Sequence, residues 1–166
     1  MTQHIAPRAI GHVGLTVKDL DKAVQWYTEI LGFRLIAPPG EVEAHVGDFG
    51  DTCADIFGPV FGKARVAQMS TANGAGLELF EFLEPAYEQP ENTFAYWKGG
   101  FFHMCIIDPD VEGLAKRIVE SGRVLRTSRI WTIYQGQPYQ VCYCQDPFGS
   151  IIEIYSHSQE QIYANQ

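Results

Sequence analysis

The chain has 166 residues, of which 46% are hydrophobic and 19% charged, a composition typical of a folded protein with one substantial core or two small ones. Its formal net charge of −8 and its lack of a Lys/Arg cluster argue against binding to a nucleic-acid backbone, which requires a basic patch. No run approaches the roughly 18 uninterrupted apolar residues of a membrane span, and the first residues lack the pattern of a secretory signal. We therefore expect a soluble, cytoplasmic protein with no nucleic-acid or membrane partner.

The first predicted elements are a short strand and an amphipathic helix. His12 lies in an apolar, strand-like run, Asp19 has the position of a helix N-cap, and Gly32 that of a helix stop. Apolar residues recur between them at helical spacing: Leu20, Ala23, Val24, Tyr27 and Leu31. We expect His12 to be buried in its strand, where its ring nitrogens need a hydrogen-bond partner or a metal.

The next stretch, APPGEVEAHVGDFGDTCADIFGPVFG, is rich in Gly, Pro and Asp. It predicts a long loop with at most one short strand. The segment GLELFEF follows at residues 76–82 and has the composition of a strand that carries Glu78. Glu81 lies on the other face of this strand, where we expect it to meet solvent or a second sheet.

The second half of the chain repeats the first. His103 lies 91 positions after His12, and the same offset relates the apolar helix positions 20, 23, 24 and 27 to Val111, Leu114, Ala115 and Ile118. The segment SIIEIYS at residues 150–156 then places Glu153 between β-formers, as Glu78 is placed earlier. The repeat predicts a first module at residues 8–84, a linker at 85–99, a second module at 100–158 and a C-terminal tail at 159–166.

One histidine and one glutamate in each half suggest a metal site. Unpaired carboxylates on the buried side of a sheet are costly, and a divalent cation is a suitable counter-charge. Two imidazoles and two carboxylates suit Zn, Ni, Co, Mn or Fe(II) and leave coordination positions for water or substrate. The predicted metal ligands are His12, Glu78, His103 and Glu153. Each of them alone is compatible with a structural role, but their matching places in the repeat favour the metal.

The motifs IGHVGLTVKDLDKAVQWYTEILGF, LELFEFLEP, FFHMCIIDPDVEGLAKRIVESG and DPFGSIIEI resemble those of the vicinal oxygen chelate superfamily. This superfamily includes glyoxalase I, methylmalonyl-CoA epimerase, extradiol dioxygenases and bleomycin or fosfomycin resistance proteins. The resemblance implies an α+β fold of two βαβββ modules whose curved mixed sheets form a metal-containing cleft. It places metal ligands on the first and last strands of each module, at the four residues named above. The motifs are most similar to those of the glyoxalase I and epimerase branches.

The resemblance implies a metal-dependent lyase or isomerase that acts on a small carbonyl-containing substrate through a metal-stabilised enediolate. Glu78 or Glu153 would then serve as the catalytic base. One alternative is an Fe(II) extradiol-type dioxygenase, in which Tyr143 would contact the substrate. The stretch TIYQGQPYQVCY lacks the histidine of that branch, so Tyr134 or Tyr139 would have to replace it. The other alternative is a metal-free ligand-binding or resistance protein of the same fold, and the family also makes a homodimer plausible.

Further residues are candidates for contact with substrate. Phe80 and Phe82 share a strand face with Glu78, and Tyr155 shares one with Glu153, so these rings are candidate walls of an apolar pocket together with Tyr143. Four arginines could each hold an anionic group, although surface charge is the ordinary role of such residues: Arg34, Arg65, Arg126 and Arg129. The four cysteines form no C-x-x-C pair and are predicted to be free thiols.

Overall fold

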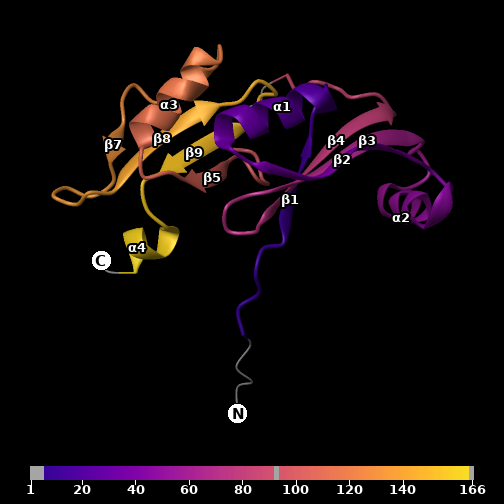
Figure 1. Cartoon of the computed structure of the whole chain (residues 1–166), viewed down its shortest axis with the longest axis horizontal. Helices are drawn as coiled ribbons and strands as arrows, with labels where there is room; N and C mark the ends of the chain where they lie inside the picture. Colours follow the sequence, from indigo (N-terminus) through magenta and orange to yellow (C-terminus); the bar gives the residue numbers. More distant parts are fainter. Residues whose placement is uncertain (1–5, 92–93, 165–166) are drawn as a thin grey trace. The chain divides into compact units, whose positions relative to one another are not determined.

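The computed structural model describes residues 6–91 and 94–164 (Figure 1). The chain divides into two compact units, Met1–Gln89 and Pro90–Gln166, and each has its own sheet and helices. None of the helices within the described residues has the length and apolar character that crossing a membrane requires.

The first unit is a four-stranded mixed sheet with two helices. Its elements are β1 (His12–Thr16), α1 (Leu20–Leu31), β2 (Arg34–Glu43), α2 (Gly47–Phe57), β3 (Lys63–Ser70) and β4 (Gly76–Glu84). The strand order is β1-β4-β3-β2, so that the first and last strands are neighbours. They run parallel, whereas β4 with β3 and β3 with β2 are antiparallel.

Helix α1 forms as the apolar spacing predicts. The Asp19 side chain accepts a hydrogen bond from the Lys22 backbone N–H, and Gly32 ends the helix in the left-handed conformation with φ of 68°. The buried face consists of Leu20, Ala23, Trp26 and Tyr27. This face contacts β2, β3 and β4, and the alternate residues Leu77 and Leu79 of β4 are buried on the same side of the sheet.

The prediction of a long loop at residues 37–62 is wrong. Its first part continues β2, whose pairing with β3 shifts register on both sides of Ala37, and a later part forms the helix α2. Cys53 of α2 is buried in a cluster with Val42, Phe61 and two residues of β3. Packing therefore stabilises a helix whose Gly and Asp content disfavours it locally.

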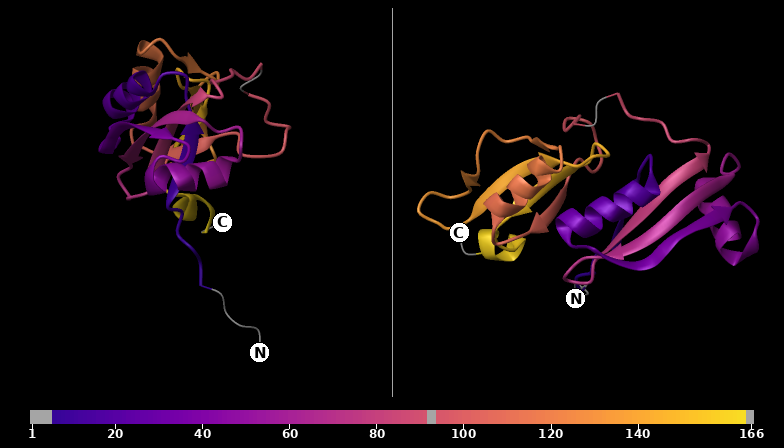
Figure 2. Two further views of the ribbon diagram at one scale, coloured as in Figure 1. Left: turned by 90° about the vertical axis from the view of Figure 1, so that its right-hand side faces the viewer. Right: turned by 45° about the horizontal axis from the view of Figure 1, so that its top comes forward.

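The second unit repeats this topology. Its elements are β5 (Met104–Ile107), α3 (Val111–Glu120), β6 (Val124–Leu125), β7 (Trp131–Thr132), β8 (Gln140–Gln145), β9 (Ile151–Tyr155) and α4 (Gln159–Tyr163). The strand order β5-β9-β8-β6 is that of the first unit, and β7 pairs with β8 off this path. Figure 2 shows α1 and α3 each lying across the sheet of its own unit. The predicted α+β class is confirmed.

The repeat extends to the helix faces and the helix starts. In α3 the four residues that the 91-residue offset predicts are all buried: Val111, Leu114, Ala115 and Ile118. Asp110 caps this helix by accepting a hydrogen bond from the Gly113 N–H at 2.9 Å, as Asp19 caps α1. The segment predicted as a tail contains α4, where Ile162 is buried and the Tyr163 hydroxyl lies 3.1 Å from that of Tyr155.

Candidate metal and substrate site

His12 and Glu78 form a pair on one face of the first sheet. They lie on the parallel neighbours β1 and β4, where Gly14 is the partner of Glu78, and His12 Nε2 is 3.3 Å from Glu78 Oε2. The side chains are 58% and 18% exposed, respectively. The expectation that His12 is buried is therefore wrong: β1 is an edge strand, and its histidine lies open on the sheet face.

His103 and Glu153 form the corresponding pair in the second unit. His103 directly precedes β5, Glu153 lies in the neighbouring strand β9, and His103 Nε2 is 3.1 Å from Glu153 Oε2. This pair is more enclosed, with side chains 26% and 8% exposed. The His103 Nδ1 atom is buried and has no hydrogen-bond partner among the described residues. A buried imidazole nitrogen without a partner is costly, which is the situation that a ligand or metal would relieve.

The two pairs occupy the same register in their sheets. Glu78 of β4 is paired with Gly14 of β1, and Glu153 of β9 is paired with Cys105 of β5. Gly14 and Cys105 each follow the histidine of their unit by two positions, so both histidines point to the same face as their glutamate. The strand pairing thus reproduces the sequence repeat at the level of individual side chains.

Each glutamate also has a polar neighbour on its antiparallel strand. Gln68 of β3 lies opposite Glu78 and donates a hydrogen bond from Nε2 to Glu78 Oε1 at 2.5 Å. Tyr143 of β8 lies opposite Glu153, and burial together with a hydrogen bond to this carboxylate raises the pKa of Tyr143. The tyrosine therefore stays a hydrogen-bond donor at neutral pH. Gln68 is not among the residues predicted from the sequence, although its polar side chain stands out between the apolar residues of β3.

Glu81 has neither of the positions that the sequence suggested. It faces α1 rather than solvent or a second sheet, where it accepts hydrogen bonds from Arg65 Nη1 at 3.0 Å and from the Leu20 backbone N–H at 3.4 Å. Arg65 also binds Asp21, so both acidic partners engage its guanidinium. This group belongs to the packing of α1 on the sheet, and Glu78 is the carboxylate on the face that carries His12.

The four candidate pocket residues differ in their surroundings. Phe80 and Phe82 stack on each other with ring centroids 5.5 Å apart, and both rings contact Phe57 of α2. The Tyr155 ring is buried. Tyr143 lines a cavity in the second unit that none of the other three residues lines.

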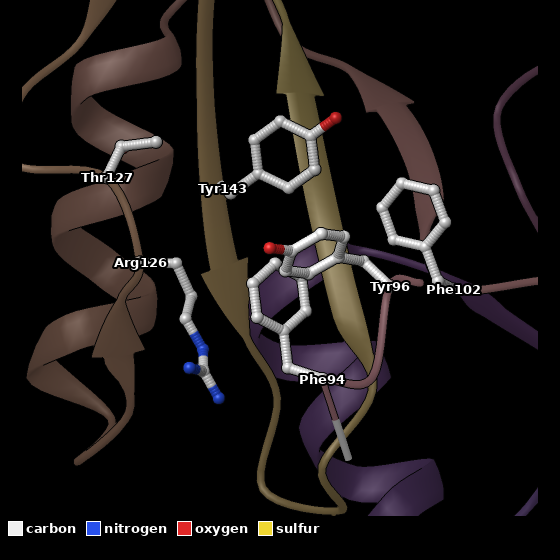
Figure 3. A pocket seen from close by; sticks show the side chains of 6 residues that line it. All are labelled: Phe94, Tyr96, Phe102, Arg126, Thr127 and Tyr143. Carbon is white, nitrogen blue, oxygen red and sulfur yellow. The ribbon is translucent and has the colours of Figure 1, made fainter. Parts of the chain in front are cut away.

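This cavity has a volume of about 280 Å³ and lies entirely within the second unit (Figure 3). Its six lining residues are Phe94, Tyr96, Phe102, Arg126, Thr127 and Tyr143. Phe102 and Tyr143 also contact the His103 ring, with centroid distances of 4.4 and 5.5 Å. The cavity and the His103–Glu153 pair are therefore adjacent.

The other residues considered from the sequence lie elsewhere. Arg34 is exposed, and Arg129 stacks on Trp131 with its guanidinium carbon 3.9 Å from the ring centroid. The Tyr134 ring contacts Tyr163, and the Tyr139 ring contacts His157. Neither tyrosine lines the cavity beside His103.

The donor set fits a divalent transition metal. Each pair offers one imidazole and one carboxylate on one sheet face, the mixture that Zn, Ni, Co, Mn and Fe(II) accept. Among the described residues, neither unit by itself gathers three or more His, Cys, Asp or Glu side chains able to hold a metal. One unit alone therefore supplies half of the usual four protein ligands.

Two successive units share one βαβββ topology, and each has a histidine on or directly before its first strand and a glutamate on the parallel last strand. This arrangement defines a class of paired-module α+β proteins. The chain belongs to the Glyoxalase/Bleomycin resistance protein/Dioxygenase superfamily, whose family model matches residues 9–154.

Individual relatives are distant. A curated protein from Actinomyces sp named 2-epi-5-epi-valiolone epimerase is 32% identical over 108 residues, which are 65% of this chain and 56% of that protein. A lactoylglutathione lyase from Pseudomonas putida is 28% identical over 149 residues, 86% of this chain and 82% of that protein. The crystal structure of a glyoxalase family protein from Bacillus cereus has a TM-score of 0.71 at 22% identity and covers 93% of this chain and 97% of that one.

Proposed function

We propose that this protein is a metal-dependent lyase or isomerase that moves a proton at a carbon next to a carbonyl group of a small substrate. The observation that carries the proposal is the repeated His–Glu pair, which stands at the same strand register in both units. The names of the two curated relatives, an epimerase and a lyase, agree with this class of reaction.

The proposed metal ligands are His12 and Glu78 from the first unit with His103 and Glu153 from the second. A divalent ion held by these four residues would supply Lewis-acid stabilisation of negative charge on a substrate oxygen. Zn, Ni, Co, Mn and Fe(II) all suit two imidazoles and two carboxylates. In each pair the imidazole Nε2 lies close to a carboxylate oxygen of its glutamate, 3.3 Å away in the first unit and 3.1 Å in the second, which supports a role for both groups as ligands of an ion.

The glutamates take the role of the base. A carboxylate can accept a proton from carbon when it lies within hydrogen-bond reach of that proton. Glu78 is the more exposed of the two glutamates and lies beside the exposed His12. Glu153 is more buried, and the Tyr143 side chain donates a hydrogen bond to it. We therefore assign the base to Glu78 first, with Glu153 as the second candidate.

Proton abstraction can be tested before the natural substrate is known. Purified protein is incubated in D2O with a panel of small α-hydroxycarbonyl and α-branched carbonyl compounds, and NMR measures deuterium incorporation at the carbon next to the carbonyl. We expect exchange with the wild type and a loss of about 100-fold or more in Glu78→Gln, because a general base contributes roughly 10²–10⁴-fold. Glu78→Gln should retain more of its metal than of its exchange activity.

Glu81→Gln is the matched control, since Glu81 lies on the same strand but faces α1. It should exchange at the wild-type rate even if it is less stable. Equal loss of metal and of exchange in Glu78→Gln would remove the assignment of Glu78 as base. Absence of exchange across the whole panel in metal-loaded protein would count against proton transfer itself. No structural observation favours the dioxygenase alternative.

A further inference from the structure

A transverse row of side chains crosses the second sheet and ends at an arginine. Tyr143 of β8 lies opposite Glu153 of β9. Leu125 of β6 lies opposite Cys144 of β8, so the residue after Leu125, Arg126, comes opposite Tyr143. The Arg126 backbone N–H donates to the Tyr143 carbonyl at 2.7 Å, which extends this register. Residues directly opposite each other share a face of a sheet. Arg126, Tyr143 and Glu153 therefore belong to one face, on successive strands.

The cavity on this face has apolar walls. Four of its six lining residues are aromatic, and Figure 3 shows them coming from the segment before β5 and from β8. Aromatic rings bind an apolar or planar ligand body by area and by stacking. The volume of about 280 Å³ lies at the small end of ligand pockets, which suits a compact molecule.

The remaining two lining residues have unused polar capacity. The Arg126 guanidinium lies 4.9 Å from the Phe94 ring centroid and donates to the Gln145 side-chain oxygen, and no carboxylate among the described residues forms a salt bridge with it. Arg65, by contrast, binds two carboxylates. The Thr127 hydroxyl oxygen is buried without a hydrogen-bond partner among the residues described. One cation and one hydroxyl are thus available to a ligand beside the aromatic walls.

Among residues 6–89, the first unit has no counterpart of this arrangement. There the row runs from Glu78 to Gln68 and then to Ala37, because Ala37 is the partner of Gln68 on β2. Alanine has neither charge nor hydrogen-bonding capacity. The two units therefore share the His–Glu pair but differ in the residue two strands away from the glutamate, which is Ala37 in the first unit and Arg126 in the second. Only the residue in the second unit can bind a charged group of a substrate and so orient it.

We propose that the cavity binds the remote end of the substrate, and that this end is a carboxylate on a compact apolar or aromatic body, held by Arg126 and Thr127. The reacting end would lie at Glu153, a part of the inference that rests on the proposed function. Two strand spacings, roughly 10 Å, separate Arg126 from Glu153 across the sheet. A single guanidinium matches the single charge of a carboxylate, whereas a phosphate dianion would keep uncompensated charge against apolar walls.

Binding can be measured on the full-length protein with phenylacetate as the probe and benzyl alcohol as its neutral comparison. Titrations followed by 1H–15N NMR give both the affinity and the residues affected. We expect phenylacetate to shift the signals of Arg126, Thr127 and Tyr143, and to bind about tenfold or more tightly than benzyl alcohol, because a charge-assisted bond to arginine adds to the apolar contact. Arg126→Gln should abolish this preference.

Arg129→Gln is the matched control, since Arg129 stacks on Trp131 and does not line the cavity. It should bind both probes as the wild type does. Equal affinities for phenylacetate and benzyl alcohol, or an Arg126→Gln variant that keeps the preference, would overturn the inference. Tighter and Arg126-dependent binding of phenyl phosphate would overturn the assignment of a carboxylate.

The His12→Ala variant separates this inference from the proposed function. His12 lies in the first unit and does not line the cavity. Phenylacetate should bind to this variant and to chelator-treated wild type with the same dependence on Arg126, whether or not metal is present. A wild type that binds no metal would contradict the proposed function and, if phenylacetate still binds, leave the cavity assignment intact. Binding that disappears whenever metal is removed would instead show that the probe binds the metal, and would overturn the cavity assignment.

Discussion

Gly76 lies directly across from His12 on the neighbouring strand. Because Gly76 has no side chain, it leaves room for the His12 side chain in its observed position. A Cβ atom built on Gly76 would lie 2.8 Å from His12 Cβ, closer than real Cβ contacts allow. Gly14, the partner of Glu78, would gain a Cβ atom with no neighbour within 4 Å. Two glycines near the same His–Glu pair therefore differ in whether a methyl group disturbs the histidine.

Gly76→Ala should displace His12 and weaken metal binding by about tenfold or more, since mutation of groups that hold metal ligands in place typically costs roughly 10- to 100-fold in affinity. It should also lower the free energy of unfolding by about 1–3 kcal/mol through overpacking. Gly14→Ala should change neither quantity by much. Calorimetric metal titration and urea unfolding of the two variants provide the test. Wild-type metal affinity in Gly76→Ala would show that His12 is not a ligand.

At this scale the sequence identified the histidines and glutamates because each stands out in an apolar strand and recurs in the repeat. It did not identify Gln68 or the row that leads to Arg126. Both depend on which residues lie opposite each other across antiparallel strands, and turn geometry and bulges set that register. The exposure of His12 was also beyond reach, because a sequence does not say that its strand is at the edge of a sheet.

Among the elements, α1 and α3 begin at equivalent aspartates. Asp19 accepts a hydrogen bond from the Lys22 N–H and Asp110 accepts one from the Gly113 N–H. Loss of such a cap costs typically about 1 kcal/mol. Asp19→Ala and Asp110→Ala should each lower the free energy of unfolding by about this amount in urea, and Asp19→Asn, which keeps a capping oxygen, should lose less.

The Asp19 cap also gives a pH dependence. Hydrogen bonds from the Lys22 side chain and backbone lower the pKa of Asp19, so its ionised form is favoured in the folded protein. This contribution to stability is present above the unfolded value of about 3.9 and is lost as the pH falls through the folded pKa. The stability difference between wild type and Asp19→Asn should therefore begin to shrink at about pH 4 and continue to shrink as the pH falls through the lower pKa of folded Asp19. A difference that stays constant until Asp19 is protonated in the folded protein would contradict the assignment.

The three long helices show what local sequence can predict. Helices α1 and α3 have an apolar residue on nearly every turn of one face, together with a cap and a stop, and were predicted from these signals. Helix α2 begins at Gly47 without a side-chain cap, and its segment is rich in Gly and Asp. It forms because Cys53 and Phe57 find apolar partners on β2, β3 and β4, a cause that lies in tertiary packing.

For the whole molecule, the proposed function requires that both units supply ligands to one metal ion. Each unit offers one histidine and one glutamate, and each unit alone is short of the ligands that a stable site needs. A shared centre predicts that damage in either unit has the same consequence. Two independent sites, or a site in one unit only, would respond differently to variants in the two halves.

The most direct test is elemental analysis of the protein purified without added metal or chelator, alongside His12→Ala and Glu153→Ala. Each variant removes one proposed ligand from a different unit. We predict about one transition-metal ion per chain in the wild type and near-complete loss in both variants. Metal that persists in His12→Ala but not in Glu153→Ala would contradict a shared centre. No metal in any sample, with none taken up on addition, would contradict the metal site altogether and favour a metal-free binding protein of this fold.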